Sequence, residues 1–408
     1  MRHSTAILLR VSLPFALGYL LSYLFRVVNA VIAPELVRDL ALHPSDLGLL
    51  TAAYFFAFAA FQLPLGVLLD RFGPRRVEAL LLVVAGAGAL LFAHGETLFA
   101  LVIGRALIGL GVSACLMAAF KAFALWHPPE RLPLVNGIQT AAGGLGALLA
   151  TAPVEGALRL VDWRLLFTGL GGATLLAALL LYLLVPEPPL TTQPLPLRQQ
   201  FAGVRQVFAS PAFWRLTPWT VASQAAFLSL QGLWAGPWLR EVVGLRRETA
   251  AGILMATAAS MVAGFLLWGA VAARAPRHGL RPLTVATFGL GLFIAVQLAI
   301  LLVGRDYPLI CWTLFGFCGT AGILPYALFS QAFPAALAGR VNTGLNVLVF
   351  FAAFAAQWGI GALIDAWLAS GNGHTLAGAY QLAFAILVGL QVAGGIWYLL
   401  AGRLRSTD

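Results

Sequence analysis

The 408-residue chain is 61% hydrophobic and only 10% charged, and its mean hydropathy is +0.90. Soluble domains carry roughly 25% charged residues, so this composition excludes a soluble globular protein and is typical of a polytopic membrane protein. A formal net charge of +10 would suit a nucleic-acid-binding protein if the chain were soluble. Here the basic residues cluster between apolar runs, and the positive-inside rule explains them without a nucleic-acid partner.

Apolar runs of about 20 residues, each long enough to cross a bilayer, recur along the whole chain. They predict an all-α integral membrane protein with twelve transmembrane helices in two pseudo-symmetric six-helix bundles. The expected spans are residues 10–33, 46–69, 77–94, 98–124, 132–154, 164–185, 213–239, 249–273, 281–303, 307–332, 341–368 and 376–401. The expected domains are an N-terminal bundle over 1–185, a Pro-rich and then basic cytoplasmic linker over 186–212, and a C-terminal bundle over 213–408.

The distribution of Lys and Arg predicts the topology. With the N-terminus in the cytoplasm, 16 of the 25 basic residues fall on the cytoplasmic side and 7 on the other, while Arg26 and Arg105 lie inside spans. This bias predicts that both termini are cytoplasmic. The short tails and the lack of an Arg/Ser-rich leader favour a bacterial inner (plasma) membrane.

The segment "GVLLDRFGPRR", residues 66–76, follows the second span. Read physically, it is a tight basic turn in which Gly66 permits close helix contact, Asp70 faces a helix N-terminus or an Arg, and Gly73 turns the chain. The alternative is a positively charged loop with a Gly turn and no further role. The residues assigned to a gating or structural motif are Gly66, Asp70, Arg71, Gly73, Arg75 and, on the fourth span, Arg105.

This segment resembles the signature loop of the major facilitator superfamily, G-x-L-x-D-R-x-G-R-R-x, and departs from it mainly at Pro74. "GRALIGLG" resembles the fourth-helix motif of that family, and "DWRLLF" and "AYQLAF" resemble the entries to its sixth and twelfth helices. The resemblance implies two bundles around a central cavity, and a signature loop that stabilises the outward-facing state. "GGLGALLATAP" resembles the drug–proton antiporter motif only loosely, which weakens an efflux interpretation.

Polar groups inside membrane spans are functional-site hypotheses by default. Tyr19, Tyr23, Arg26 and Asn29 recur at spacings of four, three and three, so they share one helix face. A guanidinium with aromatic and amide neighbours suits a carboxylate or phosphate, which it binds bidentately. The alternatives for Arg26 are snorkelling toward the outer interface and a structural helix–helix network.

Other polar and aromatic positions extend the candidate site. Gln224, Phe227, Gln231, Trp234 and Trp238 form a face that lines a cavity or packs inside a bundle, and Trp238 fits an interfacial Trp belt. Lys121 is either a second cation of the cavity or a residue that snorkels to the headgroups. The full set of predicted substrate-binding residues is Tyr19, Tyr23, Arg26, Asn29, Tyr54, Gln62, Lys121, Gln224, Gln231, Trp234, Tyr326 and Asn346.

Acidic residues are expected to avoid the middle of the spans. Asp70 and Glu78 are assigned to the cytoplasmic side, and Glu155, Asp162 and Asp365 to the outer ends. A proton-coupled exporter of organic cations usually needs a membrane-embedded carboxylate, so the buried positive charge favours anions. Coupling stays open among a proton carried by the substrate, titration of Glu155 or Asp365, and exchange of two anions.

The predicted function is secondary active transport of a small anionic solute, such as an organic acid, a phosphorylated compound or an inorganic anion, by alternating access. The alternatives are multidrug or metabolite efflux by proton antiport, and a non-transporting membrane sensor. An enzyme is not expected, because no nucleophile–base pair or metal-ligand set stands out. We expect a monomer whose partners are the solute, a coupling proton and membrane lipid, with no cofactor and no metal.

Overall fold

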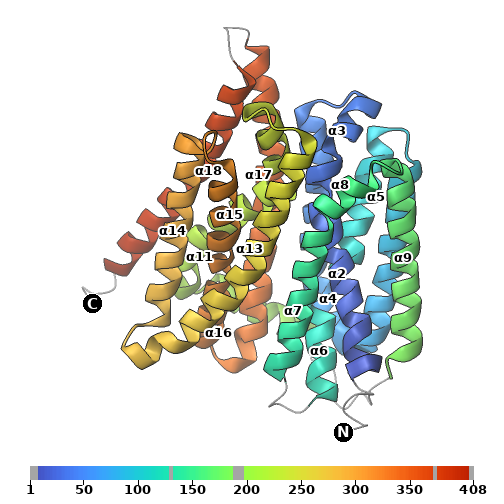
Figure 1. The fold of residues 1–408 in the computed structure, drawn as a ribbon. Helices are drawn as coiled ribbons and strands as arrows, with labels where there is room; N and C mark the ends of the chain where they lie inside the picture. The colour runs from blue at the N-terminus through green and yellow to red at the C-terminus, as the bar shows by residue number, and fades with distance from the viewer. Residues whose placement is uncertain (1–7, 128–131, 187–196, 371–374, 404–408) are drawn as a thin grey trace. The chain divides into compact units, whose positions relative to one another are not determined.

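The computed structural model describes residues 8–127, 132–186, 197–370 and 375–403, and within these ranges the chain is helical without a β-strand (Figure 1). It divides into two compact units. Unit 1 comprises Met1–Leu42 and Leu49–Leu195, and unit 2 comprises His43–Gly48 and Pro196–Asp408. The exact boundaries expected for the two bundles and the linker, at residues 185 and 213, therefore stay predictions.

The described residues of unit 1 form one short π-helical turn, η1 (Leu8–Ser12), followed by eight α-helices, of which α4 begins with residues that belong to unit 2. These are α2 (Leu13–Val27), α3 (Asn29–Leu40), α4 (Pro44–His94), α5 (Leu98–Gly111), α6 (Met117–Trp126), α7 (Leu132–Leu149), α8 (Ala152–Ala157) and α9 (Trp163–Leu184).

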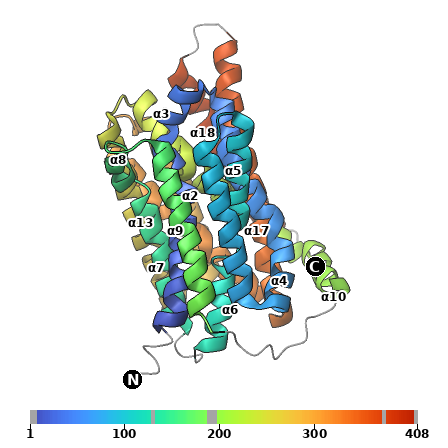
Figure 2. The same cartoon turned by 90° about the vertical axis from the view of Figure 1, so that its right-hand side faces the viewer.

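Unit 2 includes the amphipathic helix α10 (Leu197–Phe208), which packs against α17 (Figure 2). The remaining elements are α11 (Pro211–Ser229), η3 (Leu230–Trp234), α12 (Ala235–Pro237), η4 (Trp238–Val242), α13 (Arg247–Arg274), η5 (Ala275–His278), α14 (Pro282–Val303), α15 (Pro308–Gly319), η6 (Thr320–Ile323), α16 (Leu324–Ala332), α17 (Ala335–Ala369) and α18 (Leu376–Arg403).

Several expected spans are bent or broken in the structure. The first continues to Leu40 but bends by 49° between α2 and α3, so the outer loop that we expected after residue 33 is helical. The second and third spans form the single element α4, which kinks at Gly73, where φ is +77°. A glycine adopts this left-handed conformation without the steric penalty of a side chain. The turn expected there is confirmed, but it occupies one residue rather than the stretch 70–76.

Breaks in other spans account for the remaining differences. The fourth span consists of α5 and α6, separated by a turn over residues 112–116, and the tenth consists of α15, η6 and α16. The seventh contains two π-helical turns, η3 and η4, around Pro237. Within the described residues, eight helices are long and apolar enough to cross a membrane, and the bent α2–α3 pair makes a ninth. Counting the broken elements as single spans yields the twelve expected helices in chain order.

The two units share a packing pattern. In unit 1, α2 packs mainly against α7 and α9, and in unit 2, α11 packs against α17 and α18. The first span of each half thus contacts the fifth and sixth spans of the same half. Glycine makes one of these contacts possible, because a side chain at Gly146 of α7 would overlap the backbone carbonyl of Leu20 on α2. This arrangement agrees with the internal repeat that is common in secondary transporters.

Candidate functional site

The guanidinium of Arg26 lies near the C-terminal end of α2 in unit 1. Arg26 is only 7% exposed, so a charged side chain is buried within a membrane-spanning helix. The guanidinium carbon is 4.5 Å from the ring centroid of Tyr23 and 5.5 Å from that of Phe58. Both rings lie within the roughly 6 Å over which a cation is attracted to an aromatic face. Arg26 therefore sits in an aromatic pocket of unit 1.

Neighbouring tyrosines complete the pocket. The rings of Tyr19 and Tyr23 meet edge to face with centroids 5.2 Å apart. Gly143 of α7 makes room for them, because a Cβ there would lie 2.5 Å from Cε1 of Tyr19. The ring of Tyr54 on α4 stacks on Phe58 at 6.2 Å, and its hydroxyl donates a 3.3 Å hydrogen bond to the carbonyl of Ser22. Aromatic side chains from both α2 and α4 thus surround the guanidinium.

Asn29 lies on the other side of the bend between α2 and α3. It is fully buried, and its Nδ2 donates a 2.9 Å hydrogen bond to Oγ1 of Thr51. Its Oδ1 has no hydrogen-bond partner within the described residues. A buried acceptor without a donor is costly, so it is available to a hydroxyl or amide of a bound molecule. Arg26 and Asn29 therefore lie on either side of the break between α2 and α3. Broken helices of this kind form substrate sites in many transporters.

Arg105 has a different environment. It is fully buried on α5, its Nη1 donates a 2.9 Å hydrogen bond to the carbonyl of Phe25, and its guanidinium carbon is 5.2 Å from the ring centroid of Tyr54. The hydrogen bond connects α5 to the residue that precedes Arg26 on α2. This geometry agrees with the structural role expected from the fourth-helix motif, and the gating role stays a prediction.

Two further candidates of unit 1 have other surroundings. Gln62 is buried, and its Nε2 donates a 3.3 Å hydrogen bond to the carbonyl of Ser113, so the amide already serves an interhelical contact. Lys121 lies on α6 and is half-buried. The binding roles of both residues stay predictions.

The residues of the signature loop have different surroundings in the structure. Arg75 donates a 3.2 Å hydrogen bond from Nη1 to the carbonyl of Val185, so it caps the C-terminal end of α9. Arg71 is exposed, and its guanidinium carbon is 5.3 Å from the ring centroid of Phe72. No described atom lies within 4 Å of the position of a Cβ at Gly66, so the close contact expected there stays a prediction. The side chain of Asp70 lies outside the described part of the chain.

In unit 2, the polar face of the seventh span packs inside the unit. Nε2 of Gln231 donates to Sδ of Met261 at 3.0 Å, and Nε1 of Trp234 donates to the carbonyl of Gln357 at 3.0 Å. Gln224 lies against Gly322, whose Cβ position is 2.9 Å from its Cδ. The packing alternative therefore describes these three residues in this structure, and their binding roles stay predictions.

One assignment in the seventh span is wrong. Trp238 does not belong to an exposed interfacial belt, because it is only 2% exposed. Its ring meets Trp312 at 5.6 Å and stacks on Phe384 at 6.4 Å between centroids. The π-helical turn that begins at this residue changes the helical period and turns the side chain inward.

Tyr326 and Asn346 form the other polar pair of unit 2. The hydroxyl of Tyr326, on α16, donates a 3.2 Å hydrogen bond to Oδ1 of Asn346, on α17. Both residues are half-buried. The structure thus brings together two predicted residues that are 20 positions apart in sequence.

Glu78 does not lie at an exposed helix edge, as expected from its assignment to the cytoplasmic side, and the side itself stays a prediction. This residue lies in the span Arg71–His94 and is fully buried. The helix resumes directly after the Gly73 kink, so position 78 is a full turn inside it rather than at its edge. The expected span began at residue 77, which placed this carboxylate at its very edge, whereas the structure begins the span at Arg71.

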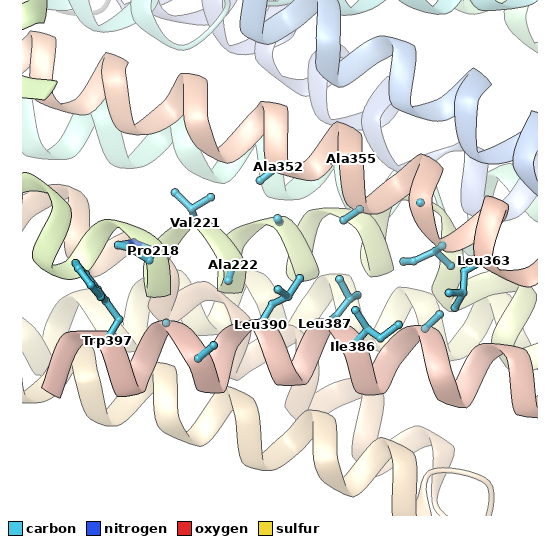
Figure 3. A pocket seen from close by; sticks show the side chains of 17 residues that line it. Pro218, Val221, Ala222, Ala352, Ala355, Leu363, Ile386, Leu387, Leu390 and Trp397 are labelled. Carbon is cyan, nitrogen blue, oxygen red and sulfur yellow. The ribbon is translucent and has the colours of Figure 1, made fainter. Parts of the chain in front are cut away.

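A groove of about 820 Å³ runs between α11, α17 and α18 of unit 2 (Figure 3). Its lining is almost entirely apolar and includes Pro218, Ala222, Ala355, Leu363, Leu387 and Trp397. The indole N–H of Trp397 is already bonded to the carbonyl of Trp214 at 2.8 Å. Among the described residues that line it, the groove offers an anion no charged side chain, so it suits an apolar occupant instead.

A variant that fills this groove tests whether the proposed anion site is independent of it. Gly359 lines the groove and has no described atom within 4 Å of its Cβ position, so Gly359→Leu enters open space. We expect this variant to keep wild-type stabilisation by anions in a thermal-shift assay, since residues of unit 2 line the groove and Arg26 belongs to unit 1. A loss of anion stabilisation would contradict this division, and a loss confined to lipophilic cations would favour efflux through the groove.

Comparison with known proteins establishes the class of the chain. Residues 15–357 match the Major Facilitator Superfamily, and this segment is more than half of the sequence. The chain belongs to this family of multi-pass membrane transporters, which confirms the resemblance seen in the signature loop. The family and its solved structures are transporters rather than enzymes.

Particular relatives share shorter segments. The chain is 29% identical over 208 residues to a probable sulfoacetate transporter of Cupriavidus necator, a match that covers 50% of this chain and 47% of that protein. It is 28% identical over 155 residues to the hexuronate transporter of Escherichia coli K12, covering 37% of this chain and 35% of the relative. The matches therefore span less than half the length of these curated relatives.

Solved structures agree over nearly the whole chain. A bacterial homolog of the human lysosomal transporter Spinster, in an inward-facing conformation, superposes with a TM-score of 0.78 at 19% identity, covering 98% of this chain and 97% of that one. A D-xylose–proton symporter superposes with a TM-score of 0.75 at 18% identity, covering 96% and 97%. These likenesses confirm the twelve-helix fold.

Proposed function

We propose that this protein is a secondary active transporter of small anions, with Arg26 as the group that binds the negative charge. The observation that carries the proposal is a guanidinium that is 7% exposed within a membrane span and held between two aromatic rings. Placing Arg in a bilayer core costs about 3 kcal/mol or more, so such a residue is retained for a function. A guanidinium fork matches the oxygens of a carboxylate, sulfonate or phosphate.

The substrate class is supported by the names of the relatives. A probable sulfoacetate transporter, hexuronate transporters and a nitrate/nitrite transporter are among the proteins that match parts of this chain. Sulfoacetate and hexuronates are small organic anions. We therefore propose an organic acid of this size as the substrate, bound through its acid group at Arg26 and through polar groups near Asn29 and Tyr54.

The proposed mechanism is alternating access, in which the two units expose the site first to one side of the membrane and then to the other. The bend beside Arg26 provides a place where helix segments can move separately, as discontinuous helices do in other transporters. We also propose that the protein acts as a monomer in a bacterial plasma membrane with both termini in the cytoplasm, as the distribution of basic residues predicts.

A thermal-shift screen of the purified protein tests the substrate class. Sulfoacetate, glucuronate and nitrate are compared with the lipophilic cation tetraphenylphosphonium at matched ionic strength. We expect at least one anion to raise the melting temperature and the cation to leave it unchanged, because a ligand at 100 times its Kd stabilises the folded state by about 2.7 kcal/mol. Stabilisation by the cation alone would contradict the proposal and favour multidrug efflux.

A further inference from the structure

Glu78 is a carboxylate inside a membrane-spanning helix without a salt bridge among the described residues. It is fully buried on α4, and neither Oε1 nor Oε2 has a hydrogen-bond partner within the described part of the chain. Its helical neighbours Val77, Ala79 and Leu82 are buried as well. The residue therefore points into the interior of unit 1 and not toward the headgroups.

A glycine on the neighbouring helix creates the space for this carboxylate. The position of a Cβ at Gly18 of α2 lies 2.6 Å from Oε1 of Glu78 and 3.8 Å from Sγ of Cys115. Any side chain at position 18 would displace the carboxylate. The carboxylate and the thiol therefore share a pocket against the bare backbone of α2.

The charged and titratable groups around this pocket come from two elements. The turn 112–116 contributes Cys115, whose thiol interacts with Glu78. Next to Gly18, α2 contributes Tyr19, and both Tyr19 and Arg26 interact electrostatically with Cys115. The pocket of Glu78 is thus connected to the Arg26 pocket through Cys115 and Tyr19.

Burial of a carboxylate disfavours its ionised form. The thiol of Cys115 is only a weak donor, so an ionised carboxylate beside it still pays a large desolvation penalty, and such groups take up a proton instead. A neutral carboxyl group avoids this penalty. Buried acids that exchange protons in this way form proton relays in pumps and transporters.

The charge of Arg26 provides an electrostatic link between anion binding and proton binding at Glu78. Gly18 and Arg26 are eight residues apart on the continuous helix α2, which places them about 12 Å apart along its axis. At an effective dielectric constant of about 20, a unit charge at this distance changes the proton affinity roughly tenfold. We expect the charge of Arg26 to lower the proton affinity of Glu78 when no anion is bound, and a bound anion to cancel that effect. We therefore expect anion and proton to bind cooperatively, each raising the affinity of the other by the same factor.

We infer that Glu78 is the proton-binding residue that couples anion transport to the proton gradient, which makes the protein an anion–proton symporter. In each cycle the carboxylate takes one proton from the water on the side of anion entry, and the O–H bond breaks again when the opposite side opens. No other bond changes. This inference rests on the proposed function, because it requires an anion at Arg26.

The test uses the full-length protein in liposomes and the variant Glu78→Gln, which keeps the size of the side chain and mimics its neutral form. The measurements are the accumulation of labelled sulfoacetate and glucuronate driven by an inward proton gradient, and the exchange of the same anions without a gradient. We expect Glu78→Gln to lose gradient-driven accumulation at least about tenfold and to retain exchange. The matched control is Glu155→Gln, which neutralises another buried carboxylate of unit 1, and we expect it to accumulate anions as the wild type does.

Two results would overturn the inference. One is undiminished accumulation by Glu78→Gln, and the other is a loss that appears only in Glu155→Gln. Wild-type protein that exchanges anions but ignores the proton gradient would also overturn it while leaving the proposed function intact. Wild-type protein that neither exchanges nor accumulates the anions would count against the proposed function.

Infrared spectroscopy tests the protonated carboxyl group without any substrate. We expect wild-type protein at neutral pH to show a carbonyl stretching band of a protonated acid that is missing in Glu78→Gln. Gly18→Ala provides a second variant, because its methyl group would lie 2.6 Å from Oε1 of Glu78 and must displace the carboxylate from this pocket. We expect the band to weaken in Gly18→Ala, and a wild-type spectrum without the band would contradict the inference whatever the transport assays show.

Discussion

Replacing Arg26 with glutamine is expected to lower the affinity for anions about 30-fold or more. Truncating one partner of a buried, hydrogen-bonded charge pair costs about 2–5 kcal/mol, and 2 kcal/mol corresponds to roughly 30-fold in Kd. The amide introduced by Arg26→Gln offers at most two donors and no charge in place of the five donors of the guanidinium. Binding of sulfoacetate or glucuronate to purified protein by calorimetry measures the difference.

Thermal stability in the absence of ligand separates a binding role from a structural one. If Arg26 serves the anion, its charge is a burden when no anion is bound, and Arg26→Gln melts at the wild-type temperature or above it. If Arg26 holds the helices together, the same variant melts lower. Arg159→Gln is the matched control, since it removes an exposed arginine of the same unit and should alter neither property.

Arg26→Lys refines this prediction. Lysine keeps the charge but loses the planar fork and its stacking on Tyr23 and Phe58. We expect an affinity between those of Arg26→Gln and the wild type. Wild-type affinity in Arg26→Gln would contradict the role of Arg26 as the anchor, whatever Arg26→Lys does.

Gly109→Ala is expected to be among the most destabilising single-methyl changes in unit 1. Gly109 lies in the "GRALIGLG" segment of α5, and a Cβ there would overlap the carbonyl of Tyr54 and lie 2.8 Å from its Cα. Backbone atoms cannot yield as a flexible side chain can, so α4 and α5 must separate. Overpacking of this kind costs about 1–3 kcal/mol, and more where backbones touch.

The effect of Gly109→Ala should extend to binding, because the displaced residue is Tyr54 of the Arg26 pocket. We expect a lower melting temperature together with weaker stabilisation by anions. Gly66→Ala is the control, since no described atom lies within 4 Å of its Cβ position. There alanine should be neutral or stabilising by up to about 1 kcal/mol, because glycine is the poorer helix former. Equal melting of the two variants would show that α4 and α5 are not in backbone contact.

Local properties of the chain predicted much of this protein. Hydropathy located the spans, because a bilayer of fixed thickness demands apolar segments of a fixed length. The kink at Gly73 was predictable from residue type, since the left-handed conformation is easy only for glycine. The face shared by Tyr19, Tyr23 and Arg26 was predictable as well, because α2 is a continuous helix from Leu13 to Val27 and keeps the 3.6-residue period.

The wrong predictions arise where the helical period is interrupted or where a helix begins at another residue than expected. Trp238 turns inward because π-helical turns interrupt the seventh span, and a face expected for a regular α-helix no longer applies. Glu78 was assigned to the wrong environment because the kink lies at a single residue, so the helix begins earlier than the hydropathy pattern suggests.

The sequence by itself thus determined the class of the protein, its twelve spans and the presence of a cation within the first of them. The tertiary structure decided which polar groups are already bonded, as Gln62 is to Ser113, and which are buried without a hydrogen-bond partner among the described residues, as Glu78 is against Gly18. Spans and helix faces follow from neighbours along the chain, whereas the burial of a carboxylate depends on a glycine 60 residues away, and only folding brings the two together.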